Sequence, residues 1–180
     1  MGRIHAMREG RDVPWSEVVA RAEAARFVLL GEIHDNADHH RLQARLLARL
    51  AAESPAPAVV FEMLASDRQA DVDAFLASGA RDPEALAERV DWKGSGWPAF
   101  DLYRPVFAAA LEAGLPLYAA GLPQGEPPGG GDSAWRERFA LDAPLPAELQ
   151  TTRIEEMFVS HCELVAREQL GPMVEIQRAR

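Results

Sequence analysis

The sequence has one cysteine, one lysine and two tyrosines among its 180 residues. The single cysteine, Cys162, excludes an internal disulfide, so no cysteine pattern indicates an oxidising compartment. No apolar run approaches the length of a membrane-spanning helix, and the N-terminal residues lack the apolar core of a signal peptide. The sequence as written is that of a cytoplasmic protein, whereas a removed lipoprotein signal would make it periplasmic or membrane-anchored, so localisation stays unknown.

Basic side chains are fewer than acidic ones. Lys and Arg number 19 against 28 Asp and Glu, which gives a net charge of −9 and a pI of about 5.0. A nucleic-acid-binding protein normally carries a basic face, so we expect no nucleic-acid partner. The apolar content of 48% and charged content of 26% are typical of a globular protein. The length predicts a single domain over residues 1–180 with a substantial core.

Three continuous apolar runs predict the strands of an α/β fold. They are FVLLG (27–31), AVVFEML (58–64) and LPLYAAG (115–121), and the first reads as a strand buried on both faces. Helices are predicted over residues 17–25 with Ser16 as N-cap, 38–53 with Asp38 as N-cap, 66–77, 82–90, about 101–112 and from about 146 onwards. This order predicts a mainly parallel sheet covered by helices, with a site at the carboxyl edge of the strands. The glycine- and proline-rich residues 124–133 predict a flexible surface loop.

Acidic and imidazole side chains follow the first apolar run directly. Glu32 and His34 alternate, so a continuing strand would place them on one face, and Glu62 reaches the same edge from the second strand. A set of two carboxylates and an imidazole suits Mn, Fe or Zn, and it equally suits acid–base chemistry. The motifs HExxH, CxxC and GxSxG are absent. The alternative is that Glu62 faces solvent or an arginine, and that Asp35 and Asn36 only form a turn.

A second candidate group combines aromatic and basic side chains. Tyr103 is close in sequence to Trp97 and Arg104. An aromatic patch with a guanidinium can hold a flat apolar ring and a carboxylate, and tyrosine is one of the axial ligands of haem iron. His39 and His40 begin a predicted helix and point about 100° apart, so we expect one at most to face a site. The aromatic residues equally fit a small core beneath the loop.

Five motifs of the sequence resemble those of the ChaN family of bacterial haem-binding uptake proteins, in the Tiki superfamily. In chain order they are LLGEIHDNADHHRLQ, VVFEML, GWPAFDLYRPVF, HC and QRAR. The resemblance covers about Phe27 to Arg180. It implies an α/β fold, haem as cofactor, a role in iron uptake and a homodimer with haem between subunits. Members often carry a lipoprotein signal, so membrane association is expected only through such a signal. The family continues beyond QRAR, so the resemblance implies a C-terminally truncated chain.

Three functional hypotheses remain open on the sequence. The first is a haem-binding protein, whose haem would be surrounded by Tyr103, Arg104, His39, His40 and Trp97. The second is a metal-dependent hydrolase of the Tiki or erythromycin-esterase type, in which Glu32, His34 and Glu62 hold a divalent metal ion and its water. The third is a binding or scaffold domain, in which the acidic turn is a structural remnant and neither haem nor metal is bound.

Overall fold

The computed structural model describes residues 2–52, 56–123, 133–160 and 163–179. The chain divides into two compact units. The first comprises Met1–Leu64 and Arg68–Ala119, and the second comprises Ala65–Asp67 and Ala120–Arg180.

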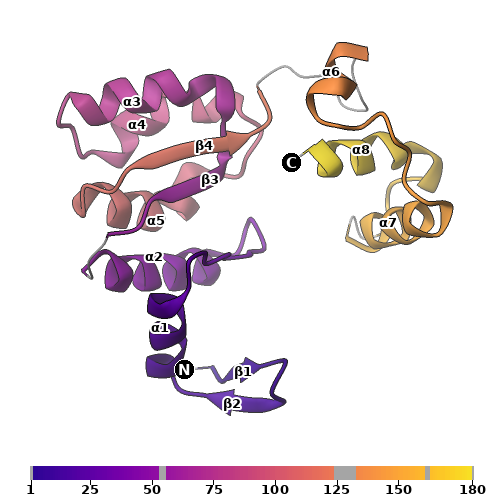
Figure 1. The fold of residues 1–180 in the computed structure, drawn as a ribbon. Coiled ribbons are helices and arrows are strands. Elements are labelled where there is room, and N and C mark those ends of the chain that lie inside the picture. Colours follow the sequence, from indigo (N-terminus) through magenta and orange to yellow (C-terminus); the bar gives the residue numbers. More distant parts are fainter. Residues whose placement is uncertain (1, 53–55, 124–132, 161–162, 180) are drawn as a thin grey trace. The chain divides into compact units, whose positions relative to one another are not determined.

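The first unit contains an N-terminal hairpin, a parallel pair of strands and the helices that pack with these strands (Figure 1). Its elements are β1 (Ile4–Ala6), β2 (Arg11–Val13), α1 (Trp15–Ala24), α2 (Ala37–Ala51), β3 (Val59–Ala65), α3 (Gln69–Ala77), α4 (Pro83–Arg89), α5 (Phe100–Glu112) and β4 (Leu117–Gly121). Two 3-10 turns, η1 (Ser66–Arg68) and η2 (Trp92–Gly94), complete the path. Strands β1 and β2 pair antiparallel, with Ile4 opposite Val13.

The β3–β4 sheet has one buried and one exposed face. The two strands are parallel neighbours, which confirms the predicted α/β class. In the view of Figure 1, α3 and α4 lie above β4, and α2 lies below β3. Phe61 of β3 stacks on Phe107 of α5 with ring centroids 4.2 Å apart. On the other face Val60 is 62% exposed and Tyr118 is 49% exposed. The sheet therefore has an uncovered face within the described residues of this unit.

The outer edge of β4 is closed by a side chain. Gln69, at the start of α3, donates its amide to the carbonyl of Leu117 at 3.1 Å and accepts from the amide of Ala119 at 2.7 Å. These are the bonds that a further strand would make. Because an open strand edge is a template for pairing with other chains, Gln69 protects this edge.

The prediction of a buried strand at residues 27–31 is wrong. The segment is extended but forms no strand ladder, and Phe27 and Leu29 are 76% and 94% exposed. A continuous apolar run predicts a buried strand only where neighbours cover it, and the described residues do not cover this one. The segment is instead tied to α2 by side-chain bonds.

The predicted helices occur, with corrections at several ends. Pro14 rather than Ser16 occupies the N-cap position of α1 and makes no side-chain capping bond, whereas Asn36 rather than Asp38 caps α2 through its side chain. Helix α2 ends at Ala51, before the predicted position 53. Helix α4 begins as predicted, because the side chain of Asp82 accepts from the amide of Glu84 and proline occupies the first turn. The β1–β2 hairpin was not predicted.

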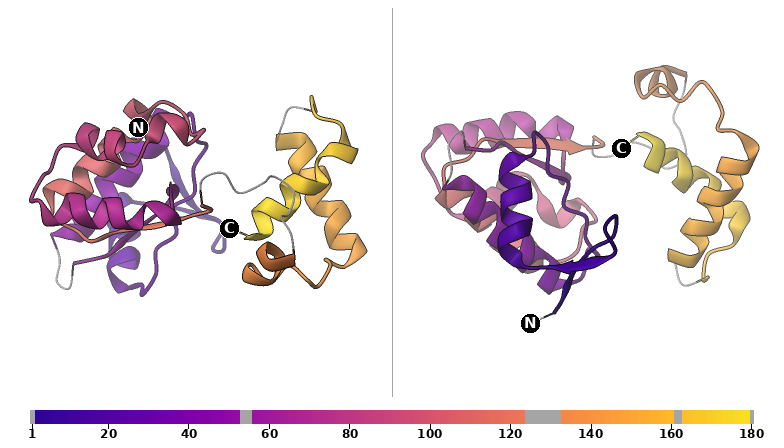
Figure 2. Two further views of the ribbon diagram at one scale, coloured as in Figure 1. Left: turned by 90° about the horizontal axis from the view of Figure 1, so that it is seen from above. Right: turned by 60° about the horizontal axis from the view of Figure 1, so that its bottom comes forward.

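From residue 133 onwards, the regular structure in the described part of the second unit is helical. It contains α6 (Ser133–Arg138), α7 (Ala147–Ser160), the 3-10 turn η3 (Arg167–Gln169) and α8 (Gly171–Ala179). Leu141, Leu170 and Val174 are its buried apolar side chains. Arg167 pairs with Glu155 through two bonds of 2.8 Å, which fastens η3 to α7. Figure 2 gives two further views of the ribbon.

Some predictions concern residues outside the described part. The predicted flexible loop lies there over 124–132, and position 133 begins α6. His161 and Cys162, which carry the HC motif, also lie outside it. In the described residues, none of the helices is long and apolar enough to cross a membrane.

Candidate functional site

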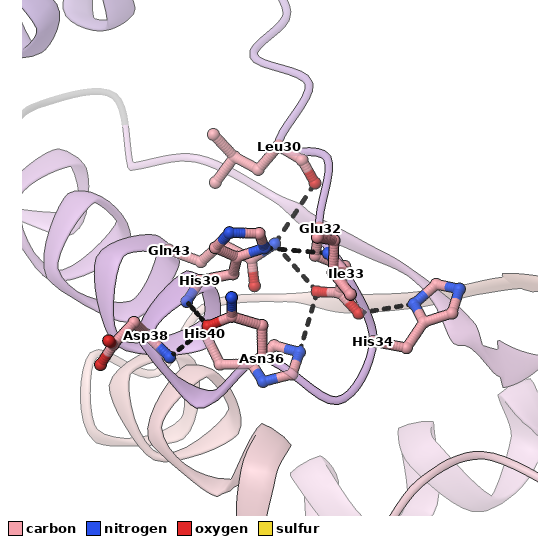
Figure 3. Close-up of polar contacts among 9 residues, drawn as sticks. All are labelled: Leu30, Glu32, Ile33, His34, Asn36, Asp38, His39, His40 and Gln43. Carbon is pink, nitrogen blue, oxygen red and sulfur yellow. Dashed lines mark hydrogen bonds and ion pairs between the residues drawn. The ribbon is translucent and has the colours of Figure 1, made fainter. Parts of the chain in front are cut away.

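The carboxylate of Glu32 is the centre of a polar cluster in the first unit (Figure 3). Its Oε1 lies 3.0 Å from Nδ1 of His34. Its Oε2 accepts from Nε2 of Gln43 at 2.9 Å and lies 3.1 Å from Nε2 of His40. The side chain of Glu32 is 7% exposed. One oxygen therefore faces His34 and the other faces helix α2.

Helix α2 holds the segment that carries Glu32 and His34. The side-chain oxygen of Asn36 accepts from the amides of Asp38 and His39 and so begins the helix. Nδ1 of His39 accepts from the backbone amide of Ile33 at 2.9 Å. Each bond joins the turn to the first residues of the helix, so the turn after residue 31 is fixed by α2 rather than by a sheet.

The electrostatics keep Glu32 ionised. Burial alone would raise the pKa of this carboxyl, but hydrogen bonds from His34 and Gln43, together with the nearby imidazole of His40, outweigh burial and hold the pKa below its usual value. An ionised carboxylate only accepts hydrogen bonds. Nδ1 of His34 therefore carries the proton in the bond to Glu32, and in the neutral ring the lone pair lies on Nε2.

His34 is the accessible imidazole of this cluster. Its side chain is 47% exposed, and its ring meets Trp97 edge to face with centroids 4.8 Å apart. The bond to Glu32 and the contact with Trp97 both restrict the ring. Imidazoles that bind metals usually donate their second N–H to a carboxylate, which fixes the tautomer and raises the basicity of the ligand. The Glu32–His34 pair therefore has the arrangement in which a carboxylate supports an imidazole ligand.

Tyr103 and His40 lie beneath the cluster, in the core. Both side chains are fully buried, and their rings are 4.2 Å apart. The hydroxyl of Tyr103 has no hydrogen-bond partner of good geometry, and the 3.1 Å contact of His40 with Glu32 is likewise short but poorly aligned. Burial first, then the charge of Glu32 and the approach of its carboxylate to the hydroxyl, raise the pKa of Tyr103, and the charges of Glu62 and Asp35 add to this. The phenolate form, which binds ferric iron, is therefore disfavoured where this ring stands.

The remaining predicted residues, Arg104 and Glu62, lie on different elements, α5 and β3. Arg104 is half-exposed on α5 and pairs with Glu84 and, at 3.5 Å, with Asp101. Glu62 lies on the exposed face of β3, close enough to Tyr103 to raise its pKa. Across the residues that the structure describes, no three His, Cys, Asp or Glu side chains gather to hold a metal ion. Glu32 and His34 are thus brought together as predicted, but not with Glu62 in such a group.

Gln43 is a residue of the cluster that the sequence did not reveal as a site residue. Its side chain donates to Glu32 and also to the carbonyl of Leu30 at 3.3 Å. The available signal was its spacing, because Gln43 follows His40 by three residues and so lies on the same face of α2. Polar side chains at that spacing face one partner.

Comparison with solved structures defines the class of fold. A structure described as "Cofacial heme binding to ChaN of Campylobacter jejuni" superposes with a TM-score of 0.74, covers 99% of this chain and 71% of that chain, and is 19% identical. At this identity the likeness concerns the fold alone. The family model described as haem-binding uptake, Tiki superfamily, ChaN matches residues 18–180, so the chain belongs to this family. Comparison with curated proteins gave no match.

Proposed function

We propose that this chain binds haem through His34 as the axial ligand of the iron, and that it serves in haem or iron uptake. The observation that carries the proposal is the exposed imidazole of His34, whose Nδ1 is held by Glu32 at 3.0 Å. Haem, when bound, supplies an iron centre with an open axial position, which a histidine nitrogen commonly fills. Membership of a family described by haem-binding uptake supports the role in uptake.

The residues around His34 suit the ring of a porphyrin better than a hydrated metal ion. Trp97 presents an aromatic surface at the imidazole, and Ile33 next to it is 62% exposed. Apolar and aromatic side chains with one fixed polar ligand are typical of a cofactor site. Tyr103 and His40, by contrast, are enclosed by core residues and lack an open side for a ligand. The hydrolase hypothesis and a divalent metal ion would need a fuller ligand set, and the described residues contain no cluster of three His, Cys, Asp or Glu side chains.

We further propose that haem is held by a homodimer, as the family resemblance implies. The support within this chain is the exposed apolar segment that precedes the site, in which Phe27 is 76% and Leu29 94% exposed. Exposed apolar patches of this kind commonly mark interaction surfaces.

A haemin titration of the purified protein tests the role of His34. The wild type is expected to give a saturable, shifted Soret band. His34→Ala is expected to weaken haem affinity by at least about 10- to 100-fold, because that is the usual loss when only a residue supporting the ligand is removed. His5→Ala is the matched control, because His5 is 48% exposed and its Nδ1 lies 2.9 Å from the carboxylate of Asp12. Equal affinity in the wild type and both variants would exclude His34 as the ligand. A spectrum equal to free haemin plus protein would reject haem binding.

A further inference from the structure

We propose that Gln43 is the positioning residue of the candidate haem site, acting through Glu32 to fix the tautomer of His34. The two oxygens of the Glu32 carboxylate divide between two tasks. Oε2 is held by Gln43 and His40, and Oε1 is left for His34. Gln43 itself touches neither His34 nor, under the proposed function, the haem.

Gln43 is suited to this task by its place on a rigid element. It lies near the middle of α2, a helix of 15 residues, whereas Glu32 lies in an extended segment outside any sheet. The amide of Gln43 uses both N–H groups, one on Glu32 at 2.9 Å and one on Leu30 at 3.3 Å. These bonds restrain the carboxylate and the backbone two residues before it together. Figure 3 shows the amide between Leu30 and Glu32.

His40 is a weaker restraint on the same oxygen. Its Nε2 is 3.1 Å from Oε2 but is not aligned as a hydrogen bond, and its ring packs on Tyr103. The aligned bond to Oε2 therefore comes from Gln43. Without it, Oε2 keeps only the weaker contact with His40, and the bond from Oε1 to His34 competes with water.

The consequence for the imidazole is a choice between two neutral tautomers. A carboxylate fixed at Nδ1 keeps the proton there and leaves the lone pair on Nε2. A stronger acceptor at Nδ1 also makes Nε2 a better electron donor. The effect on haem iron rests on the proposed function. A more basic ligand favours ferric over ferrous iron, so the one-electron midpoint potential of bound haem is lowered.

The first test uses the haem-free protein. Nitrogen-15 NMR of the His34 ring, at a pH where the ring is neutral, is expected to show the Nδ1–H tautomer in the wild type and a mixture in Gln43→Leu. Gln43→Met, which keeps the side-chain length and lacks donors, is the second variant if the first does not fold. The control is Gln69→Leu, which removes an equally half-buried amide with two backbone bonds at the edge of β4. A wild-type tautomer in a folded Gln43 variant overturns the inference.

The second test measures the midpoint potential of the haem-loaded protein. Gln43→Leu is expected to raise the one-electron midpoint potential by up to about 59 mV. This corresponds to a preference for ferric over ferrous haem that is up to about tenfold weaker. In a Glu32→Gln background the same change should have no further effect, because Gln43 acts through Glu32. An additive shift in that background contradicts the inference. If the wild type fails to bind haem while the tautomer responds to Gln43, the proposed function fails and the positioning role stands.

Discussion

At the scale of single residues, the buried hydroxyl of Tyr103 carries a prediction about stability. It has no hydrogen-bond partner of good geometry, and a buried polar group left unpaired costs about 1–3 kcal/mol. Tyr103→Phe is therefore expected to leave the free energy of unfolding unchanged or to raise it, as measured by urea denaturation. Tyr118→Phe is the control, because Tyr118 is 49% exposed and its hydroxyl reaches solvent.

The same variant separates two candidate haem ligands. Tyr103→Phe should leave the Soret band of the haem-loaded protein unchanged, because this ring is fully buried against Trp92 and His40. A shifted band would mean that the phenol leaves the core to reach the iron. A loss of stability above about 1 kcal/mol would show that the hydroxyl has a bonding partner after all.

The sequence predicted contacts between site residues that are close in the chain, but not contacts between residues farther apart. Glu32 and His34 are two positions apart, and their proximity follows from local geometry alone. The bond from Gln43 spans 11 residues and depends on how α2 packs against the preceding segment. The burial of Tyr103 depends on residues of several helices. Periodicity predicts that a helix has a buried face, but not which of its polar atoms meets which partner.

At the scale of secondary-structure elements, the start of α2 offers a direct comparison of two cap residues. Sequence rules favour Asp and Asn about equally at an N-cap, so they could not distinguish Asn36 from Asp38. The predicted N-cap, Asp38, lies two residues after the observed one. The structure uses Asn36, which accepts from the amides of Asp38 and His39 at 3.0 and 3.4 Å. Asn36→Ala is expected to lower the free energy of unfolding by about 1 kcal/mol, measured by urea denaturation.

Asp38→Ala is the matched change for this helix. The side chain of Asp38 is 81% exposed and pairs with Arg41, and an exposed pair contributes little. We expect its loss to cost less than that of Asn36. If Asp38→Ala instead cost more stability than Asn36→Ala, the cap would belong to Asp38, as the sequence rules predicted. The turn that positions Glu32 and His34 would then not be held by Asn36.

The strands show why the sheet was only partly predictable. The runs at 58–64 and 115–121 became β3 and β4, whose Phe61 and Leu117 are buried. The run at 27–31 is likewise apolar but is exposed and forms no strand pair in the described chain. Composition measures how favourable burial would be, whereas formation of a strand also requires a neighbour that supplies backbone bonds. Only the fold supplies that neighbour.

At the scale of the whole molecule, the exposed apolar segment connects the site to the proposed homodimer. Phe27, Leu29 and Ile33 expose most of their side chains within seven residues, immediately before and beside His34. Such a segment loses apolar area from water if a second subunit covers it, which favours association. Haem placed at His34 would add its own apolar surface at the same place, so haem loading and dimer formation should be coupled.

Sedimentation equilibrium at increasing haem-to-protein ratios tests this coupling. The wild type is expected to shift from monomer to dimer as haem is added, and Leu29→Glu to weaken the dimer by at least about tenfold, because a charge would have to be desolvated in the interface. Met7→Glu is the control, since Met7 is 85% exposed in the turn between β1 and β2, away from the segment in sequence. Saturation of a monomer with one haem per chain would refute the dimer while leaving His34 as the ligand. An equal effect of both glutamates would indicate that added negative charge, rather than the segment, controls association, because the chain already carries a net charge of −9.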